Sequence, residues 1–311
     1  MTVENNVEDV ERVIDRIGRL QSSPTIARKL LGLTRDPDFE MDDVVGCLEH
    51  DPALAARILR VVNSSRYGLS HRVSGIRHAA VYLGRGSLRI FIVSFALVDT
   101  LAKGARGSLL SDYWQRALTM ATVSSELGSK LPGVSKDDVY TGGLLADVGV
   151  LAIAQVEWPA YRAIYEGSSH GSELPQAEQD EFGFSHPFLG ARLLERWDLP
   201  ETVVRSTEYH HSTPDNPQPL DLSVRAADLV AEALINTTPP SVSAALEFVE
   251  KEFSLDSDQF VELAAACAKD AADSVEVFGG GLAPATDVQK LIDEVHRVKS
   301  GAALDMAEAE S

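Results

Sequence analysis

Apolar residues recur at helical spacing along most of the chain. In residues 6–20 they include Val7, Val10, Ile14 and Ile17, which share one face of a helix with about 3.6 residues per turn. No stretch before residue 110 alternates apolar and polar positions with period two, so no strand is predicted there. Similar runs predict further helices over residues 24–36, 41–50, 53–63, 74–83, 88–101, 111–130, 161–166, 176–182, 186–197, 201–209, 222–235, 241–253, 256–277 and 286–298. The pattern therefore predicts an all-α protein.

Capping residues mark where several of these helices begin and end. Ser23-Pro24 and Asp51-Pro52 each read as an N-cap followed by a proline in the first turn. Asn63–Gly68 contains turn-forming residues, and Gly84–Gly86 interrupts the helical pattern. These signals divide the first third of the chain into short helices followed by one long apolar helix.

One stretch, Tyr140–Ile153, is apolar almost all round, and Asp147 is its only acidic residue. Such runs can be buried strands, but the length and the N-cap signal of Ser135, with Asp137 and Asp138 in the first turn, favour a helix. We therefore predict a buried central helix. A carboxylate in that place needs a cation, a metal ion or hydrogen-bond donors, or else it keeps its proton.

Charge is distributed unevenly along the chain. The 311 residues, 44% of them hydrophobic, are enough for one large core or two modest ones, and the net charge is −19. Residues 1–110 carry 15 Lys/Arg against 13 Asp/Glu, whereas residues 111–311 carry 13 against 34. A field of that sign repels nucleic acids and anionic membranes, so we expect neither as a partner.

Several features favour a folded cytoplasmic protein. The apolar run Leu88–Leu101 contains Arg89 and Asp99 and falls short of the ~20 residues of a membrane span, so it reads as a core helix. The first residues lack the basic and apolar regions of a signal peptide. Cys47 and Cys267 lie far apart among apolar residues and read as packed, reduced thiols.

A local excess of positive charge lies between residues 84 and 107, where four cations face only Asp99. Cations at helix ends are usually solvated caps. The alternative is a patch that binds an anion or an acidic partner, formed by Arg85, Arg89, Lys103 and Arg106.

The order of several motifs resembles the HDOD family, whose members are non-catalytic relatives of HD-domain metal phosphohydrolases. The motifs are Asp51-Pro-Ala-Leu-Ala-Ala-Arg-Ile-Leu-Arg60, Asn63-Ser64, Tyr67-Gly68, Leu83-Gly84, Tyr113-Trp114, Gly143-Leu-Leu-Ala-Asp-Val-Gly149, His186 with Gly190, Leu199-Pro200 and Tyr209-His210-His211. The resemblance implies an N-terminal helical bundle packed on a degenerate HD-like bundle. The expected division is the start of a helix over 1–16, an HDOD domain over 17–212 (17–110 and 111–212), a helical extension over 213–300 and a disordered tail over 301–311.

In the catalytic HD superfamily, a metal is held by a histidine, an adjacent His-Asp dyad and a later aspartate. Carried onto this chain, the first histidine falls on Arg116, the dyad on Ala146-Asp147 and the last ligand on Asp228. Two of the four ligands are absent, so the resemblance implies no metal and no cofactor. We expect Arg116 to supply the positive charge by pairing with Asp147 and Asp228; the alternative is that Arg116 points to solvent and Asp147 caps a local backbone group.

The histidines allow two interpretations. His186 precedes a proline at a helix start, and His210 and His211 end a helix, where histidine commonly acts as a cap or dipole partner. These three imidazoles, with Asp147 and Asp228, are also weak candidates for a reduced metal site. The remaining histidines read as surface or packing residues: His50, His71, His78, His170 and His296.

The resemblance implies a non-catalytic bacterial signal-transduction module that binds a protein or a small ligand. The expected partner is a signalling protein, such as a cyclic-dinucleotide or two-component protein, and the oligomeric state stays open. The enzyme alternative is a divergent metal-dependent phosphohydrolase acting on a nucleotide or cyclic dinucleotide. A nucleic-acid binder using the basic N-terminal stretch is disfavoured by the acidic remainder. The expected ligand site is the cleft around Asp147, and the segment of Arg85 and Arg89 is the second choice.

Overall fold

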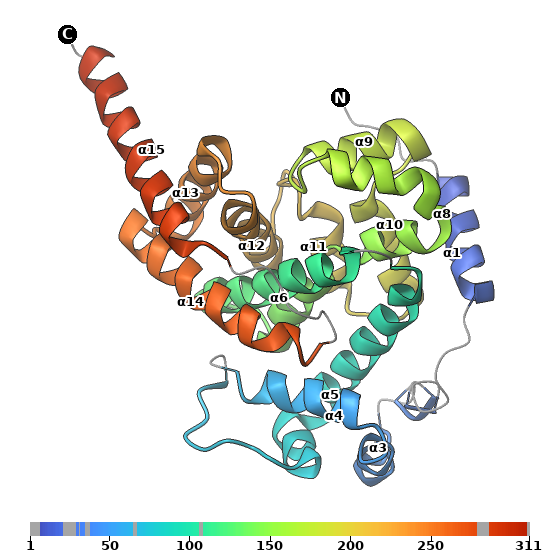
Figure 1. The fold of residues 1–311 in the computed structure, drawn as a ribbon. Coiled ribbons are helices and arrows are strands. Elements are labelled where there is room, and N and C mark those ends of the chain that lie inside the picture. The colour runs from blue at the N-terminus through green and yellow to red at the C-terminus, as the bar shows by residue number, and fades with distance from the viewer. Residues whose placement is uncertain are drawn as a thin grey trace.

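The computed structural model describes residues 7–20, 29–30, 32–34, 38–64, 67–105, 108–278 and 286–309, and in these ranges it contains helices and no strand. The prediction of an all-α protein is confirmed (Figure 1). The helices of the first half are α1 (Val7–Leu20), α3 (Met41–Leu48), α4 (Pro52–Val62), α5 (Ile76–Leu101), the 3-10 turn η2 (Ala102–Gly104), α6 (Leu109–Gly128) and α7 (Lys136–Leu145). Those of the second half are α8 (Val148–Gly167), α9 (Glu173–Phe182), α10 (His186–Arg196), α11 (Glu201–Tyr209), α12 (Pro219–Ile235), α13 (Pro239–Phe253), α14 (Ser257–Val275) and α15 (Val288–Ala309).

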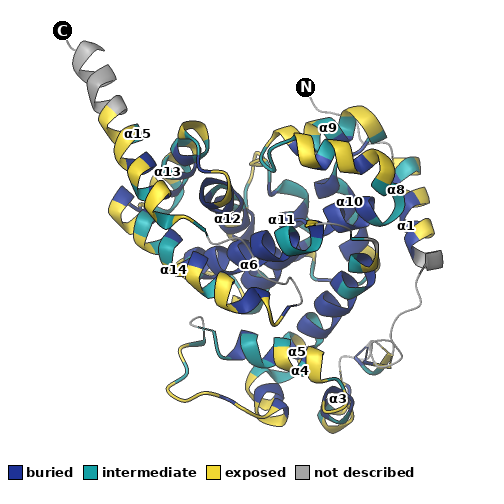
Figure 2. Ribbon diagram, in the orientation of Figure 1, coloured by how far each residue is buried: buried dark blue, intermediate teal, exposed yellow. Residues whose placement is uncertain are grey.

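Helix α6 lies at the centre of the fold. Its residues from Tyr113 to Ser125 are all buried, although several are polar, and α7, α12 and α14 pack against it (Figure 2). A helix covered on several sides has no solvent-facing stripe, so its polar residues must find partners inside the protein. Arg116, which lies on this helix, is therefore buried and has to pair with other buried groups.

The stretch Tyr140–Ile153 is buried as predicted, but the prediction of one helix is wrong. Helix α7 ends at Leu145 and α8 begins at Val148, with Asp147 as N-cap at φ −91° and ψ 14°. A Cβ on Gly143 would lie 2.5 Å from the Met120 carbonyl oxygen of α6, and one on Gly149 would lie 2.1 Å from the His186 carbonyl oxygen of α10. Each helix thus makes a close backbone contact with a different neighbour, α7 with α6 and α8 with α10.

The N-terminal bundle consists of α3, α4 and the start of α5. Asp51 caps α4 by accepting a hydrogen bond from the Leu54 N–H at 3.1 Å, as the sequence indicates. Gly84, at φ 73°, interrupts α5, and most of the helix after the break is buried against the rest of the protein. The Ser23-Pro24 cap lies outside the described residues.

Helix α1 does not join the N-terminal bundle, because it packs against α8 and α10. It also crosses residue 17, the predicted start of the HDOD domain. Helix α8 continues to Gly167 with non-helical geometry at Glu157, just before Pro159, so the predicted separate helix over 161–166 is its last part. Proline removes a backbone donor and bends a helix, which explains the break in the pattern.

The C-terminal helices pack on the same core. The proline-rich segment 212–219 leads into α12, which lies directly against α6. Arg57 of α4 stacks over Trp114 at 5.6 Å and over Phe278 at 5.9 Å, and thereby joins three parts of the chain. Helix α15 extends to Ala309, and the disorder expected over residues 301–311 stays a prediction. That segment is rich in alanine, the strongest helix former.

Two helical stretches are long and apolar enough to cross a membrane by length and composition. They are residues 76–101 and 136–167. In each stretch the most apolar 18 residues are largely inside the protein, with 56% and 94% of them buried. Core helices of soluble proteins satisfy the same criterion, so these stretches are weak evidence for a membrane and agree with the interpretation of 88–101 as a core helix.

Candidate functional site

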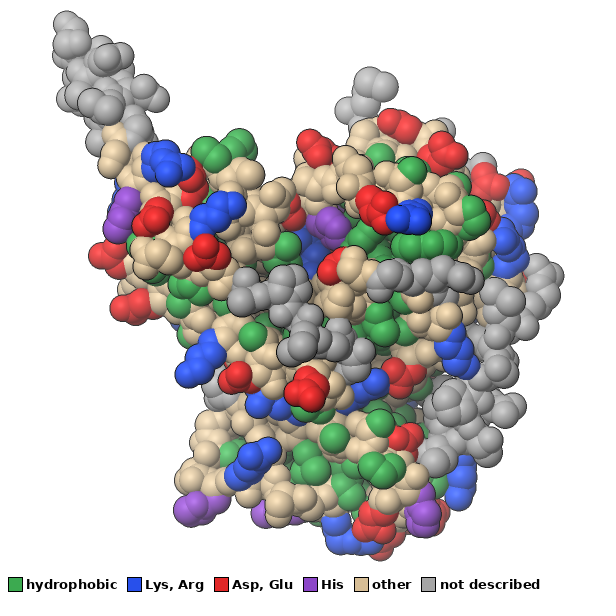
Figure 3. Space-filling model, in the orientation of Figure 1, with side chains coloured by type: hydrophobic (Ala, Val, Ile, Leu, Met, Phe, Trp, Pro, Cys, Tyr) green, Lys and Arg blue, Asp and Glu red, His purple; other side chains and the backbone are tan. Residues whose placement is uncertain are grey.

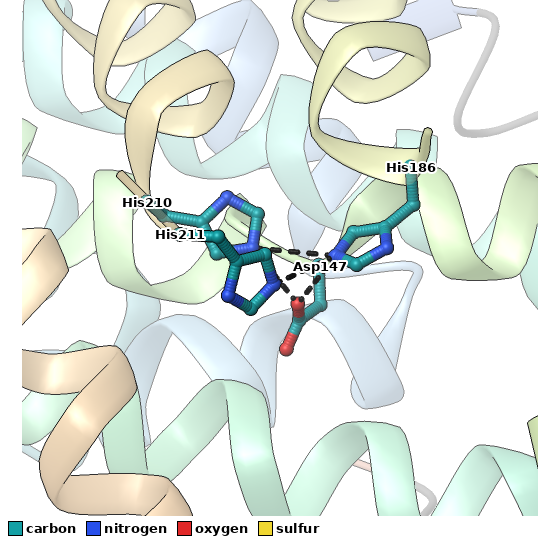
Figure 4. A group of neighbouring side chains, drawn as sticks. All are labelled: Asp147, His186, His210 and His211. Atoms are coloured by element: carbon teal, nitrogen blue, oxygen red, sulfur yellow. Dashed lines mark hydrogen bonds and ion pairs between the residues drawn. The ribbon is translucent and has the colours of Figure 1, made fainter. Parts of the chain in front are cut away.

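Five segments far apart in the sequence bring their polar side chains to one place in the core. Arg116 comes from the middle of α6, Asp147 from the junction of α7 and α8, and His186 from the first turn of α10. The other members are His210 and His211, just after α11, and Asp228 on α12. Figure 4 shows three imidazoles arranged around the Asp147 carboxylate.

Arg116 points into the protein and contacts three carboxylates. Its Nε donates to Oδ2 of Asp147 at 2.8 Å, its Nη1 to Oε2 of Glu232 at 3.1 Å, and its Nη2 to Oδ1 of Asp228. The residue is only 3% exposed. The alternative in which the guanidinium faces solvent therefore does not hold, and Asp147 makes no side-chain cap to α8.

The electrostatics keep this group charged. Burial opposes charge on each member, but Asp147, Asp228 and Glu232 together raise the pKa of Arg116 above its ordinary value. Burial would raise the pKa of Asp147, yet the Arg116 charge and hydrogen bonds from His186 and His210 hold that pKa well below its usual range. The pKa of Asp228 is lowered as well, against burial, by His211 and Arg116.

His186 is held by a buried acid that the sequence analysis did not single out. Glu178 of α9 is fully buried, and its Oε2 accepts from the His186 backbone N–H at 2.6 Å and lies 2.7 Å from His186 Nδ1. Its other oxygen accepts from the Tyr161 hydroxyl at 2.7 Å. Burial lowers the pKa of His186, but the Glu178 charge and the hydrogen bond to Asp147 outweigh it and raise the pKa to about 9.

His210 and His211 are likewise each oriented by an acceptor that faces Nδ1 of the ring. Nδ1 of His210 lies 2.6 Å from the Thr207 carbonyl oxygen, and Nδ1 of His211 lies 3.1 Å from Oδ2 of Asp228. Arg225 supports both, because its Nη1 donates to Oδ2 of Asp228 at 2.7 Å and to the His210 carbonyl oxygen at 3.2 Å. Burial lowers the pKa of His211 to about 3, so that imidazole is neutral.

The Nε2 atoms of the three imidazoles converge. His186 Nε2 lies 3.4 Å from His210 Nε2 and 3.1 Å from His211 Nε2. Oδ1 of Asp147 lies 3.2 Å from His210 Nε2 and 3.4 Å from His186 Nε2. One ligand-type atom from each of the four residues lies within 4.8 Å of the others. The interpretation of these histidines as caps or dipole partners therefore does not account for the convergence of their Nε2 atoms on one point.

The metal set implied by the catalytic HD relatives does not fit these residues. Ala146 is fully buried and offers no ligand atom, and Arg116 fills the adjoining position with a permanent positive charge. The guanidinium binds the same two aspartates, Asp147 and Asp228, that would otherwise face the ion. No hydrolytic step through that metal can be derived for this chain.

The site lies near the surface on one side. On the face drawn in Figure 3, a hollow separates the C-terminal helices from the side of α8 and α9, and histidine atoms are visible in it. His170 contacts the Tyr165 ring edge to face at 4.7 Å, and burial lowers its pKa to about 4. A Cβ on the neighbouring Gly171 would lie 4.0 Å from Glu232. The loop around residue 170 thus lies beside the carboxylates that hold Arg116.

Two residues of the site could have been found from the sequence. Glu232 follows Asp228 by four residues in an otherwise apolar part of α12, which places both on one helix face. Glu178 follows the buried Leu174 by four residues, and so shares the inward face of α9. An acid on the apolar face of a helix is the signal in both cases.

The predicted cation patch is not a single surface. Arg85 and Arg89 line a cavity of about 360 Å³, in which Arg89 pairs with Asp198 at 2.5 Å. Arg85 also lies 3.6 Å from the exposed Asp38. Lys103 lies in η2, just after the C-terminal end of α5 and roughly 20 Å from Arg89 at about 1.5 Å per residue. Arg106 lies outside the described residues.

Comparison with known proteins gives one family. The model of the HDOD domain matches residues 20–213. An uncharacterized protein of Treponema pallidum (strain Nichols) is 27% identical over 236 residues, which are 71% of this chain and 44% of the relative. The chain thus spans less than half of that relative's length.

Solved structures show the same fold. A candidate phosphohydrolase from Shewanella amazonensis SB2B is 22% identical with a TM-score of 0.63, over 86% of this chain and 97% of that one. An HDOD domain protein with unknown function from Geobacter sulfurreducens is 25% identical with a TM-score of 0.57, over 87% and 98%. A candidate signal transduction protein from Marinobacter aquaeolei VT8 is 21% identical with a TM-score of 0.57, over 89% and 67%.

Proposed function

The chain belongs to the HDOD family, and on that premise we propose that it is a regulatory module of bacterial signal transduction, which acts in the cytoplasm by binding and does not hydrolyse phosphate esters. The observation that carries the proposal is the buried guanidinium of Arg116, held by Asp147, Asp228 and Glu232. A fixed organic cation there neutralises the carboxylates, but it cannot lower the pKa of a bound water as a metal ion does.

The binding surface of the module lies outside the buried cluster. Arg116 and Asp147 are 3% and 4% exposed, so a protein partner cannot reach them without rearrangement. The cavity lined by Arg85, Arg89 and Asp198 is open to solvent and lies at the turn between α10 and α11. These are the helices that carry His186 and His210, so a partner seated there contacts the elements that form the cluster.

The competing function is metal-dependent phosphoester hydrolysis. Three converging imidazoles beside Asp147 favour it, and one structure with this fold comes from a candidate phosphohydrolase. The two functions differ in what they predict for turnover, because a hydrolase needs an ion with an open coordination position and a binding module does not.

Turnover assays test the catalytic part of the proposal. The purified full chain is incubated with Mn²⁺, Fe²⁺ or Zn²⁺ and with two phosphodiester probes, bis(p-nitrophenyl) phosphate and a cyclic dinucleotide. We expect no more phosphoester cleavage than with the Asp147→Asn variant. Cleavage that requires the metal, stops on chelation and disappears in Asp147→Asn would overturn the proposal.

A binding experiment tests the regulatory part. The wild-type chain and the double variant Arg85→Glu/Arg89→Glu are used as baits in extract of the native host, with Arg162→Glu as the control. Arg162 forms only an exposed pair with Glu166. We expect a signalling protein to be retained by the wild type and the control and lost with the double variant. Equal retention by all three, or none by the wild type, would contradict the proposed surface.

A further inference from the structure

The cavity beside Arg85 and Arg89 is lined by three segments that lie far apart in the sequence. They are Phe39, just before α3, residues 85–93 of α5, and residues 198–200 between α10 and α11. The volume of about 360 Å³ lies at the lower end of the range of ligand pockets, about 300–1,000 Å³. Phe39, Val93 and Leu199 are each at most 8% exposed, so the inner wall of the cavity is apolar.

The wall formed by the α10–α11 turn is held in one shape. Asp198 has a φ of 57°, in the left-handed region, and its N–H donates to the Glu195 carbonyl at 3.0 Å. The Leu199 N–H donates to the Leu194 carbonyl at 3.1 Å, and Pro200 is the N-cap of α11 with its own φ fixed by the ring. A partner that enters this cavity therefore does not have to order the turn first, which favours binding.

Positive charge predominates at the mouth of the cavity. Arg85 and Arg89 are four residues apart on α5, which places their Cβ atoms about 5–6 Å from one another on one helix face. Asp198 is the one acid among the described residues that line the cavity. The side chains of Asp198 and Asp38 are 86% and 94% exposed, and ion pairs with such exposed carboxylates are weak. Both guanidiniums can therefore exchange these carboxylates for one that a partner brings.

Gly86 leaves open space at the same place. It lines the cavity, and a Cβ added to it would meet no atom within 4 Å. Its φ is not in the left-handed region, and other residues are more favourable than glycine inside a helix. The local backbone thus does not require a glycine, and a side chain at this position would occupy the space through which a partner enters.

We propose that the cavity binds a short acidic peptide segment of the signalling partner, which rests on the regulatory function proposed above and names the chemistry of its partner. An apolar side chain of the segment packs against Val93 and Leu199, and a neighbouring carboxylate pairs with Arg85 and Arg89. Guanidinium presents paired N–H donors that match the two oxygens of a carboxylate. Apolar anchors in preformed pockets are the contacts that contribute most to affinity in protein interfaces.

Selection from a library of random peptides displayed on phage tests this chemistry without the native partner. The library is first depleted on the full-length Gly86→Leu variant, whose new side chain fills the mouth of the cavity, and is then selected on the full wild-type chain. We expect the enriched peptides to share Asp or Glu beside a large apolar residue. Enriched peptides without an acid, or no peptide that prefers the wild type over Gly86→Leu, would contradict the proposal.

Affinities of the most enriched peptide, made synthetically, locate its site. Gly86→Leu and Arg89→Met should each weaken binding by at least about 10-fold, measured by fluorescence anisotropy. Two controls should bind as the wild type does. Gly46→Leu adds a side chain to another helix at a glycine that also has no atom within 4 Å of the new Cβ, and Arg162→Met removes only the exposed pair with Glu166. Equal affinities for the wild type, Gly86→Leu and Arg89→Met would overturn the proposed site.

A double-mutant cycle between the two molecules identifies the ion pair. The acid of the peptide is changed to its amide, and both peptides are measured with the wild type and with Arg89→Met. The arginine should matter much less for the amide peptide, because the carboxylate that it binds is gone. The same loss for both peptides would show that Arg89 does not bind the acid. Circular dichroism checks each variant, and Gly86→Leu, which changes no charge, decides the site even if Arg89→Met does not fold.

A second copy of this chain is the competing occupant of the cavity. Analytical ultracentrifugation of the wild type and of Gly86→Leu distinguishes it, since a dimer that only the wild type forms would mean that the chain itself fills the cavity and would overturn the proposal. None of these measurements uses host extract or turnover. Selected peptides that lack an acid would therefore leave the regulatory function standing, whereas phosphoester cleavage would remove that function without changing which peptides bind.

Discussion

Arg116 donates from Nε to Oδ2 of Asp147 at 2.8 Å, while the other oxygen of the same carboxylate lies 3.2 Å from Nε2 of His210. One acid thus joins two groups of different chemistry, a fixed guanidinium on α6 and an imidazole cluster at the ends of α10 and α11. Removing either partner leaves the buried Asp147 carboxylate with only one of its two groups of partners. The sign and the approximate size of the resulting change in stability can therefore be predicted.

Replacing Arg116 by alanine should strongly destabilise the protein. The change leaves three carboxylates buried beside one another without their common cation, which costs about 3–5 kcal/mol in the free energy of unfolding. Urea unfolding measures the loss. Arg162→Ala, which removes only an exposed pair with Glu166, is the matched control and should change stability by less than about 0.5 kcal/mol.

The double variant separates a lost ion pair from lost packing. Asp147→Asn removes one of the charges that Arg116→Ala leaves unpaired, so the second change should cost less in the Arg116→Ala background than in the wild type. A double-mutant cycle measures this coupling as the departure from additivity. Additive effects of the two changes would show that the guanidinium stabilises the core through its volume alone.

Much of the fold follows from local pattern. The helical spacing and the caps at Asp51 and Ser135 were enough to predict an all-α protein, because both signals depend on residues a few positions apart. The break between α7 and α8 was missed because no proline marks it, and the close contacts on either side of it, of Gly143 with Met120 and of Gly149 with His186, are made with other helices. Periodicity carries no information about such tertiary contacts.

The sequence predicted which residues form the site better than it predicted how they are arranged. The sequence pointed to Arg116 and Asp147 through a family resemblance, but nothing local shows that His186 and His211 turn Nε2 toward one point. That direction is set by what holds Nδ1, and Glu178 is such a group. It lies on α9 four residues after Leu174, on the same helix face, and that spacing is a signal that the sequence analysis did not use.

Gly149 should be intolerant of any side chain. A Cβ there would lie 2.1 Å from the carbonyl oxygen of His186, and backbone cannot move aside as a flexible side chain can. We expect Gly149→Ala to destabilise the protein by about 3 kcal/mol or more. Gly46→Ala, in a helix with no atom within 4 Å of the added Cβ, should be neutral or stabilise by up to about 1 kcal/mol. Equal effects in denaturant titrations would contradict this close packing.

Glu178→Gln tests the group that orients His186. The amide oxygen can still accept from the imidazole, and the amide nitrogen can donate to the Tyr161 hydroxyl, so the fold should survive. The negative charge beside the ring is lost, so the pKa of His186 should fall from about 9 when its ring protons are followed by NMR through a pH titration. Tyr161→Phe keeps the carboxylate and should change that pKa much less. An unchanged His186 pKa in Glu178→Gln would show that the acid serves the fold alone.

Phe278 tests whether the C-terminal helices form a separate unit. Its ring is fully buried and lies 5.4 Å from Phe95 of α5 and 5.1 Å from Trp114 of α6, while Arg57 of α4 stacks on it. Phe278→Ala should therefore destabilise the whole chain by about 3–5 kcal/mol.

One continuous core predicts one cooperative transition, which Phe278→Ala shifts as a whole. The neighbouring Val277 is 37% exposed, so Val277→Ala serves as the control and should stay within about 0.5 kcal/mol. Two transitions monitored by tryptophan fluorescence and circular dichroism, with only one of them moved by Phe278→Ala, would instead support an extension that folds on its own. In that case the contact of Arg57 with Phe278 would be a docking contact between separate units and not part of a shared core.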